Sequence, residues 1–170
     1  MEQEQLHGGV KACGVWIVEH WRDGVLLGVD ETKNLIVNQG LNHILDVVLH
    51  GNTPVSPWYI GIFKGNYTPV VGVTGTTIRA DSTESNDFTE GARVVYNEAA
   101  AASQVTTNSA NKAVFTMNAT ETVYGAFLAD IAAWASAPGT VLAATRFATS
   151  RAVISADVLS VTYAITAASA

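Results

Sequence analysis

The sequence contains a single cysteine, Cys13, which excludes an intrachain disulfide and a thiolate metal cluster. We predict that Cys13 is a small, buried, apolar side chain. The sequence also lacks a long apolar run, since its longest falls far short of the roughly 20 residues of a membrane helix. Its first residues, MEQEQLHGG, lack the basic and apolar regions of a signal peptide. We therefore expect neither a membrane partner nor secretion.

Charge is scarce as well. Charged residues make up 14% of the 170 residues, against about 25% in an ordinary soluble domain. The net charge is −6, and no basic run interrupts the sequence. Nucleic acid is therefore an unsuitable partner, because phosphate binding needs clustered cations. A surface with so few charges favours a protein that packs against neighbours.

The strongest helical pattern lies at about residues 38–50. Asn38 is the predicted N-cap, and Gly51 follows the last turn as a C-terminal stop. Apolar residues recur there at helical spacing, at Leu41, Ile44, Leu45, Val48 and Leu49. We predict that this apolar stripe closes the core as a lid.

Most of the remaining sequence is predicted to form strands. A β-hairpin is expected from Ala12 to Val37, because β-prone runs flank the turn signal Arg22-Asp23-Gly24. The Gly-rich and Thr-rich segment from Gly65 to Asn86 is predicted to be a long loop with at most one short element. Further strands are expected at 58–64, 92–98, 112–118, 123–134, 141–148 and 158–166, and a loop at 99–109.

Six to eight strands with one α-helix predict a mainly β protein, an antiparallel β-sandwich or a jelly-roll-like fold. The chain is long enough for one self-supporting core. We predict a flexible N-terminal arm at residues 1–11 and a single β-sandwich domain at residues 12–170 that begins with the hairpin.

No set of residues predicts an active site. His43 and His50 share the helix but lie about 10 Å apart along it, too far to bind one metal without a third element. The acids considered for a carboxylate pair lie mostly in predicted loops; they are Glu84, Asp87, Glu90, Glu98, Glu121 and Asp130. We predict no catalytic residue, no cofactor and no metal site.

Two other motifs are incomplete. Asp81, Glu84 and Asp87 lack the spacing of an EF-hand calcium loop. The Gly72–Thr77 stretch lacks the Gly-Lys-Ser/Thr ending of a phosphate-binding loop. The tryptophans fall into two groups, with Trp16 and Trp58 predicted in the core and with Trp21 and Trp134 near strand ends, where an interface is possible.

Four segments carry a family resemblance: 34–45 with its Asn-Gln-Gly-Leu-Asn start, WYIGIF at 58–63, RVVY at 93–96 and VISADVLSVTY at 153–163. With these segments the chain resembles small structural proteins of tailed bacteriophages. The resemblance implies a non-enzymatic virion protein of the capsid decoration or cement type.

Such a protein binds the major capsid protein on the capsid exterior, stabilises the shell, forms a homo-dimer or homo-trimer, and is made in the host cytoplasm. The hairpin from Ala12 to Val37 departs from the simplest such proteins and is a candidate interaction element. Capsid contacts are otherwise expected in the N-terminal arm, in residues 65–86 and in residues 99–109.

Two other functions stay open. A tail- or fibre-associated adaptor or receptor-binding protein would be present in a handful of copies per particle, whereas a cement protein would be present in many. A carbohydrate-binding or glycan-cleaving sandwich domain would present an exposed aromatic platform beside two acids.

Overall fold

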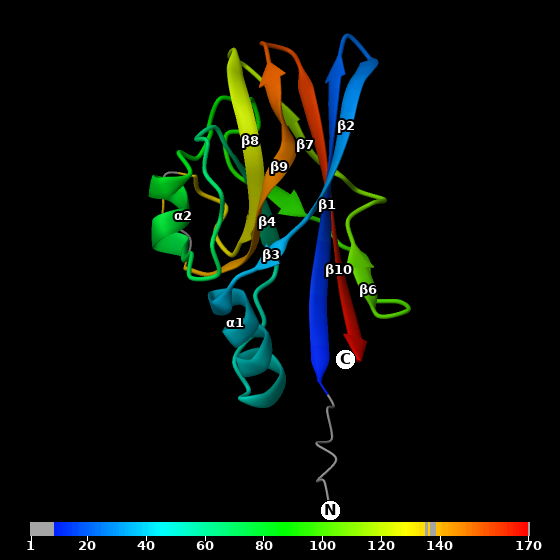
Figure 1. The fold of residues 1–170 in the computed structure, drawn as a ribbon, viewed down its shortest axis with the longest axis vertical. Helices are drawn as coiled ribbons and strands as arrows, with labels where there is room; N and C mark the ends of the chain where they lie inside the picture. Colours follow the sequence, from blue (N-terminus) through cyan, green and yellow to red (C-terminus); the bar gives the residue numbers. More distant parts are fainter. Residues whose placement is uncertain (1–8, 135, 137–138, 170) are drawn as a thin grey trace, which may run out of the picture.

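The computed structural model describes residues 9–134, 136 and 139–169, and two antiparallel β-sheets form its centre (Figure 1). In order, the first sheet contains β2 (Val25–Lys33), β1 (Val10–Arg22), β10 (Val158–Ser169) and β6 (Val105–Thr107), with β7 (Ala113–Thr116) also paired to β10. In order, the second sheet contains β3 (Leu35–Ile36), β9 (Val141–Val153), β8 (Glu121–Ala129), β4 (Trp58–Phe63) and β5 (Val94–Tyr96). This architecture confirms the predicted antiparallel β-sandwich.

Strands β1 and β10 form the long axis of the first sheet. They are antiparallel and pair continuously from Val10 with Ser169 to Trp21 with Val158. The described ends of the chain therefore lie at one end of the molecule, and the β1–β2 turn lies at the other (Figure 1). Asp23 and Gly24 both have positive φ in that turn, as a tight two-residue hairpin requires.

The predicted hairpin is confirmed, but it is shorter than Ala12 to Val37. Its second strand ends at Lys33, and the chain then crosses to the second sheet as β3.

The main core lies between the two sheets. Alternate residues of β1 point into it, and Trp16 stacks on Tyr163 of β10 with ring centroids 4.3 Å apart. The largest side chains that share this core with Trp16 and Tyr163 are Phe115, Ile60, Ile62, Met117, Leu128 and Leu159. The prediction that Trp16 fills the interior is confirmed, whereas Trp58 is half-buried at the edge of the core.

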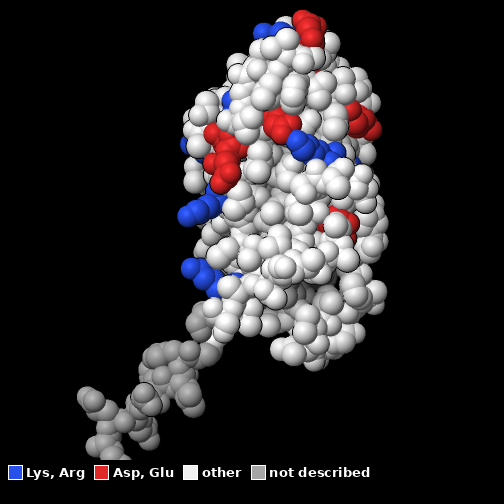
Figure 2. Space-filling view, turned by 90° about the vertical axis from the view of Figure 1, so that its right-hand side faces the viewer, with Lys and Arg blue, Asp and Glu red and all other residues white. Residues whose placement is uncertain are grey.

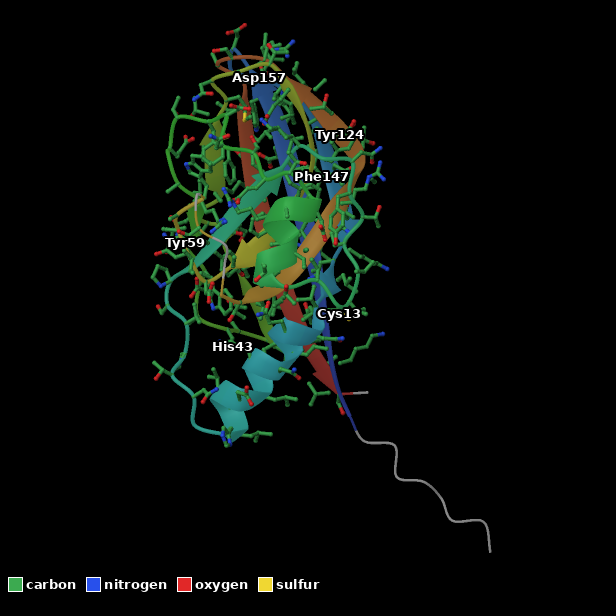
Figure 3. All side chains as sticks on the ribbon, turned by 90° about the vertical axis from the view of Figure 1, so that its left-hand side faces the viewer. Cys13, His43, Tyr59, Tyr124, Phe147 and Asp157 are labelled. Atoms are coloured by element: carbon green, nitrogen blue, oxygen red, sulfur yellow. The ribbon has the colours of Figure 1, made fainter. Side chains whose placement is uncertain are left out.

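The segment predicted as a long loop at 65–86 contains a second helix, α2 (Gly75–Asp81). A capping box between Thr74 and Thr77 starts this helix. Val73 and Ile78 are buried in a second apolar cluster with Phe63, Phe127 and other residues of the second sheet. The segment therefore covers the outer face of that sheet (Figures 1 and 3). This helix of seven residues is the one short element that the prediction allowed, although so short a periodic signal did not locate it.

The predicted first helix is confirmed as α1 (Asn38–Leu49). Its N-cap is Val37, which makes no side-chain hydrogen bond, so the prediction of an Asn38 cap is wrong. Gly51, just beyond the helix, has a φ of 76°, which fits its predicted role as a stop.

Gly40 sets how closely α1 approaches β9. A Cβ atom at this position would lie only 2.2 Å from the carbonyl oxygen of Leu142. We therefore expect Gly40→Ala to lower the free energy of unfolding by about 1–3 kcal/mol, because α1 must move away from the sheet. Urea unfolding measures the change, with Gly72→Ala as a control because a Cβ there meets open space. An unchanged midpoint for Gly40→Ala would contradict the described contact.

Three further predictions need correction. Cys13 is exposed, because it lies on the outer side of β1, in the part of the strand that precedes its pairing with β2. The predicted 99–109 loop contains β6, and β9 continues to Val153. Of the predicted flexible arm at 1–11, residues 1–8 lie outside the described residues, and residues 10–11 belong to β1.

Neither described helix is long and apolar enough to cross a membrane.

Candidate contact surfaces

Helix α1 turns its most apolar side toward solvent. Gly40 is its one buried residue, and Ile44 is half-buried against the main core. Four outward side chains are between 40% and 78% exposed, and we call them the α1 stripe: Leu41, Leu45, Val48 and Leu49. The prediction that the whole apolar pattern forms a lid is therefore wrong, since only its Ile44 edge reaches the core. An exposed stripe of this kind typically marks a contact surface.

An apolar groove of about 270 Å³ runs beside the inner edge of α1. Its walls come from the helix, from the segment after it, and from both sheets, through Val47, Val55, Trp58, Leu142 and Ile165. His43 also lines the groove and meets the Trp58 ring edge-on at 5.3 Å. His43, which was considered with His50 as a metal ligand and set aside, thus contacts an aromatic ring.

A second apolar surface lies at the opposite end of the molecule, on the β1–β2 hairpin (Figure 1). Four side chains of β2 are between 43% and 61% exposed, and we call them the hairpin patch: Val25, Leu26, Leu27 and Val29. The patch lies on an edge strand of the first sheet. An exposed apolar edge strand tends to pair with another protein chain or to be covered by one.

Charged residues are scarce at the end of the molecule that holds α1, although Lys11 of β1 is exposed there. Asp46 is the only Asp, Glu, Lys or Arg between residues 34 and 63, and residues 99–111 and 158–169 have none. In Figure 2 the lower right of the first-sheet side is free of both charge colours, while most charged side chains lie higher. A partner at this end would therefore meet an almost uncharged surface.

The structure brings together two of the acids considered for catalysis, Asp87 and Glu121. The ammonium group of Lys64 lies between them, with its Nζ 2.5 Å from Asp87 Oδ2 and 3.4 Å from Glu121 Oε2. Hydrogen bonding to Lys64 lowers the pKa of Asp87, and burial raises the pKa of Glu121. The pKa values move apart as in an acid–base pair. However, Lys64 bridges the two carboxylates, so the arrangement is an ion-pair cluster.

Glu84 belongs to a different cluster, deep against the second sheet. Arg93 donates two hydrogen bonds to its carboxylate, at 2.6 and 2.8 Å. The guanidinium group of Arg93 is fully buried and also donates to the carbonyl oxygens of Ile131, Ala133 and Ser136. This single side chain therefore fixes the segment that follows β8 to the segment that follows α2.

A third cluster joins β1 to the β9–β10 turn. Asp157 is fully buried and accepts hydrogen bonds from Nε and Nη2 of Arg22, at 2.7 and 2.8 Å. Its carboxylate also contacts His20 Nε2 at 2.8 Å and accepts from the Ile154 amide. The Arg22 guanidinium holds the pKa of Asp157 well below its usual range. The Asp157 carboxylate therefore remains ionised inside the fold at neutral pH.

The remaining acids do not assemble into a site. Glu90 accepts from the Thr116 amide, and Asp130 accepts from the Gly139 amide. Asp81, Glu84 and Asp87 do not form a metal-binding group, and no group of three or more His, Cys, Asp or Glu suited to a metal occurs among the described residues.

Trp134 and Trp21, which were predicted near strand ends, are both half-buried. Trp134 is half-buried, and the guanidinium of Arg79 lies 6.0 Å from the centre of its ring. The nearest acid, Glu84, is committed to Arg93. The platform beside two acids that a glycan-cleaving domain needs is therefore not formed at Trp134. Trp21 is half-buried on β1 and donates a hydrogen bond to Glu19.

Sequence reasoning missed the hairpin patch and the Arg93 and Asp157 clusters. The run Val25-Leu26-Leu27-Gly28-Val29 does not alternate between apolar and polar residues, which was a signal that both sides of this strand are apolar. A lone arginine before an apolar strand, as in Arg93-Val94-Val95-Tyr96, was a weaker signal of a buried ion pair.

Comparison with known proteins identifies no family: no protein-family model matches the chain, and no curated protein matches it. The β-sandwich alone does not define a function, because unrelated activities share this fold.

Proposed function

We propose that this protein is a non-enzymatic virion structural protein, a decoration or cement protein that binds the major capsid protein lattice and stabilises the shell. One observation supports the proposal most: two separate apolar surfaces lie at opposite ends of a rigid sandwich (Figure 1). A protein that bridges subunits needs two contact surfaces. The sequence resemblance to structural proteins of tailed bacteriophages supports the same function.

In this proposal the hairpin patch contacts the capsid protein. The patch belongs to the element that departs from the simplest proteins of the resembled group. It lies at the end of the molecule where the β9–β10 turn also lies, so a neighbouring subunit can reach it from that end (Figure 1). Each copy adds a modest binding free energy, and many copies on one shell add up by mass action.

Titration of the purified protein onto shells assembled without it tests this function. We expect saturable binding, and we expect Leu27→Asp to weaken it by about ten- to a hundredfold, because a charge would be buried in an apolar contact. Val114→Asp is the matched control, since Val114 is 41% exposed and lies on β7, outside the patch and outside the expected contact segments. A lack of saturable binding by the unmodified chain would refute the function, and equal loss in both variants would refute the role of the patch.

A further inference from the structure

We infer that the α1 stripe is a homodimer interface, on which α1 of a second copy packs antiparallel across a two-fold axis near Leu45. The starting observation is the orientation of the helix. Leucine side chains that would normally face a core point outward, and Val48 lies between them and the groove, although α1 is held in place by Gly40 and Ile44 on its other side. A helix turned in this way packs against its own fold along one side and lacks a partner on its outer side.

The spacing of the stripe makes it complementary to itself. Leu41 and Leu49 lie four residues before and after Leu45, slightly more than one helical turn each way. In an antiparallel pair centred on Leu45, Leu41 of one copy therefore faces Leu49 of the other. Leu45 meets Leu45 at the axis, and Val48 fills the space beside it. An interface with two-fold symmetry requires such a self-complementary pattern.

The scarcity of charge on α1 also favours a second copy of the chain as the partner of the α1 stripe. Asp46 is the only charged residue of α1, and it points about 100° away from Leu45 around the helix. Two stripes therefore meet without like-charge repulsion, and the antiparallel arrangement places the N-terminus of each helix dipole beside the C-terminus of the other. A strongly charged partner would gain nothing from this surface.

The size of the contact indicates a dimer of limited strength. Twelve residues make α1 about 18 Å long, and a helix pair of that length covers only part of the roughly 1,200 Å² that stable interfaces bury. The exposed, uncharged residues 51–54 directly after the helix extend the surface. We therefore expect a monomer–dimer equilibrium that depends on concentration.

Sedimentation of the full chain over a wide concentration range tests the inference. We expect the unmodified chain to dimerise and Leu45→Asp to weaken the dimer by about a hundredfold or more, because each dimer contains the change twice. Val114→Asp is the matched control, since Val114 is 41% exposed, Leu45 is 55% exposed, and Val114 belongs to neither apolar surface. A monomer at every concentration, or a dimer unaffected by Leu45→Asp, would overturn the inference.

A cysteine cross-link tests the antiparallel register. In a Cys13→Ser background, Leu45→Cys places two thiols at the two-fold axis, so mild oxidation should give a covalent dimer. Leu41→Cys should cross-link poorly with itself, because it faces position 49 of the other copy. Efficient cross-linking of Leu41→Cys with none of Leu45→Cys would overturn the proposed pairing. These experiments use no capsid, so the inference and the proposed function can fail separately.

Discussion

Replacement of Arg93 by methionine is expected to lower the free energy of unfolding by about 3–5 kcal/mol, because Glu84 would stay buried without its cation. Arg93 also donates to three backbone carbonyls, so the change leaves those acceptors unsatisfied as well. Urea unfolding followed by tryptophan fluorescence measures the loss.

Two further variants make this experiment specific. Arg146→Met is the matched control, since Arg146 is exposed and makes only a 3.4 Å contact with Thr68 and a 5.8 Å contact with the Tyr124 ring, and we expect it to change stability by less than about 1 kcal/mol. Adding Glu84→Gln to Arg93→Met removes the stranded charge and should restore part of the loss. If Arg93→Met were no less stable than Arg146→Met, the buried ion pair would not have the structural role described.

Asp157→Asn is expected to cost about 2–4 kcal/mol at neutral pH, because it weakens the paired hydrogen bonds from Arg22 and the contact with His20. The control is Asp23→Asn, at an exposed position of the hairpin turn where asparagine tolerates the positive φ. If Asp157→Asn were as stable as the control at neutral pH, the Asp157 cluster would not stabilise the contact between β1 and the β9–β10 turn.

The same variant has a defined pH dependence. The pKa of Asp157 is lowered in the folded protein, so its contribution to stability is complete above the unfolded pKa of about 4 and is lost as the pH falls below it. The unmodified protein should therefore lose stability in acid more steeply than Asp157→Asn does. As the pH falls from about 4 to about 3, the unfolding free energies of the two proteins should draw closer, and they should meet only below the folded pKa of Asp157; a constant difference from neutral pH to about pH 3 would contradict the assignment.

The sandwich could be predicted because its signals are local. β1 alternates buried and partly exposed residues from Gly14 to Trp21, and the turn signal at Asp23-Gly24 separates the strand from β2. Helix α1 could be predicted for the same reason, from apolar spacing and from Gly51. These features depend on neighbours within one or two turns of the chain.

The orientation of α1 could not be predicted. Apolar periodicity identifies which side of a helix is apolar, but whether that side faces the core depends on distant residues. Here Gly40 allows the closest approach, to Leu142 of β9, and this fixes the rotation of the helix with Leu45 outward. Such a contact joins residues about a hundred positions apart and leaves no trace in a local window.

The buried ion pairs could not be predicted from the sequence either, because the fold, rather than the local sequence, brings their partners together. Arg22 and Asp157 are 135 residues apart in sequence, yet the pairing of β1 with β10 brings them together. The acids themselves were recognised at Glu84, Asp87 and Glu121, but their cations were not assigned to them. Without those cations the acids could be mistaken for solvated loop residues, whereas Glu84 and Glu121 are almost fully buried.

The long pairing of β1 with β10 has a mechanical consequence. The 13 residues of β1 span about 44 Å, from the end that holds α1 to the hairpin patch (Figure 1). Tension between those two ends acts along the strands, at right angles to the hydrogen bonds between them, so the bonds share the load in shear. Tension applied to the two chain ends instead opens the same bonds one after another. The fold therefore resists force best along the direction in which a bridging protein on an expanding shell would be stretched.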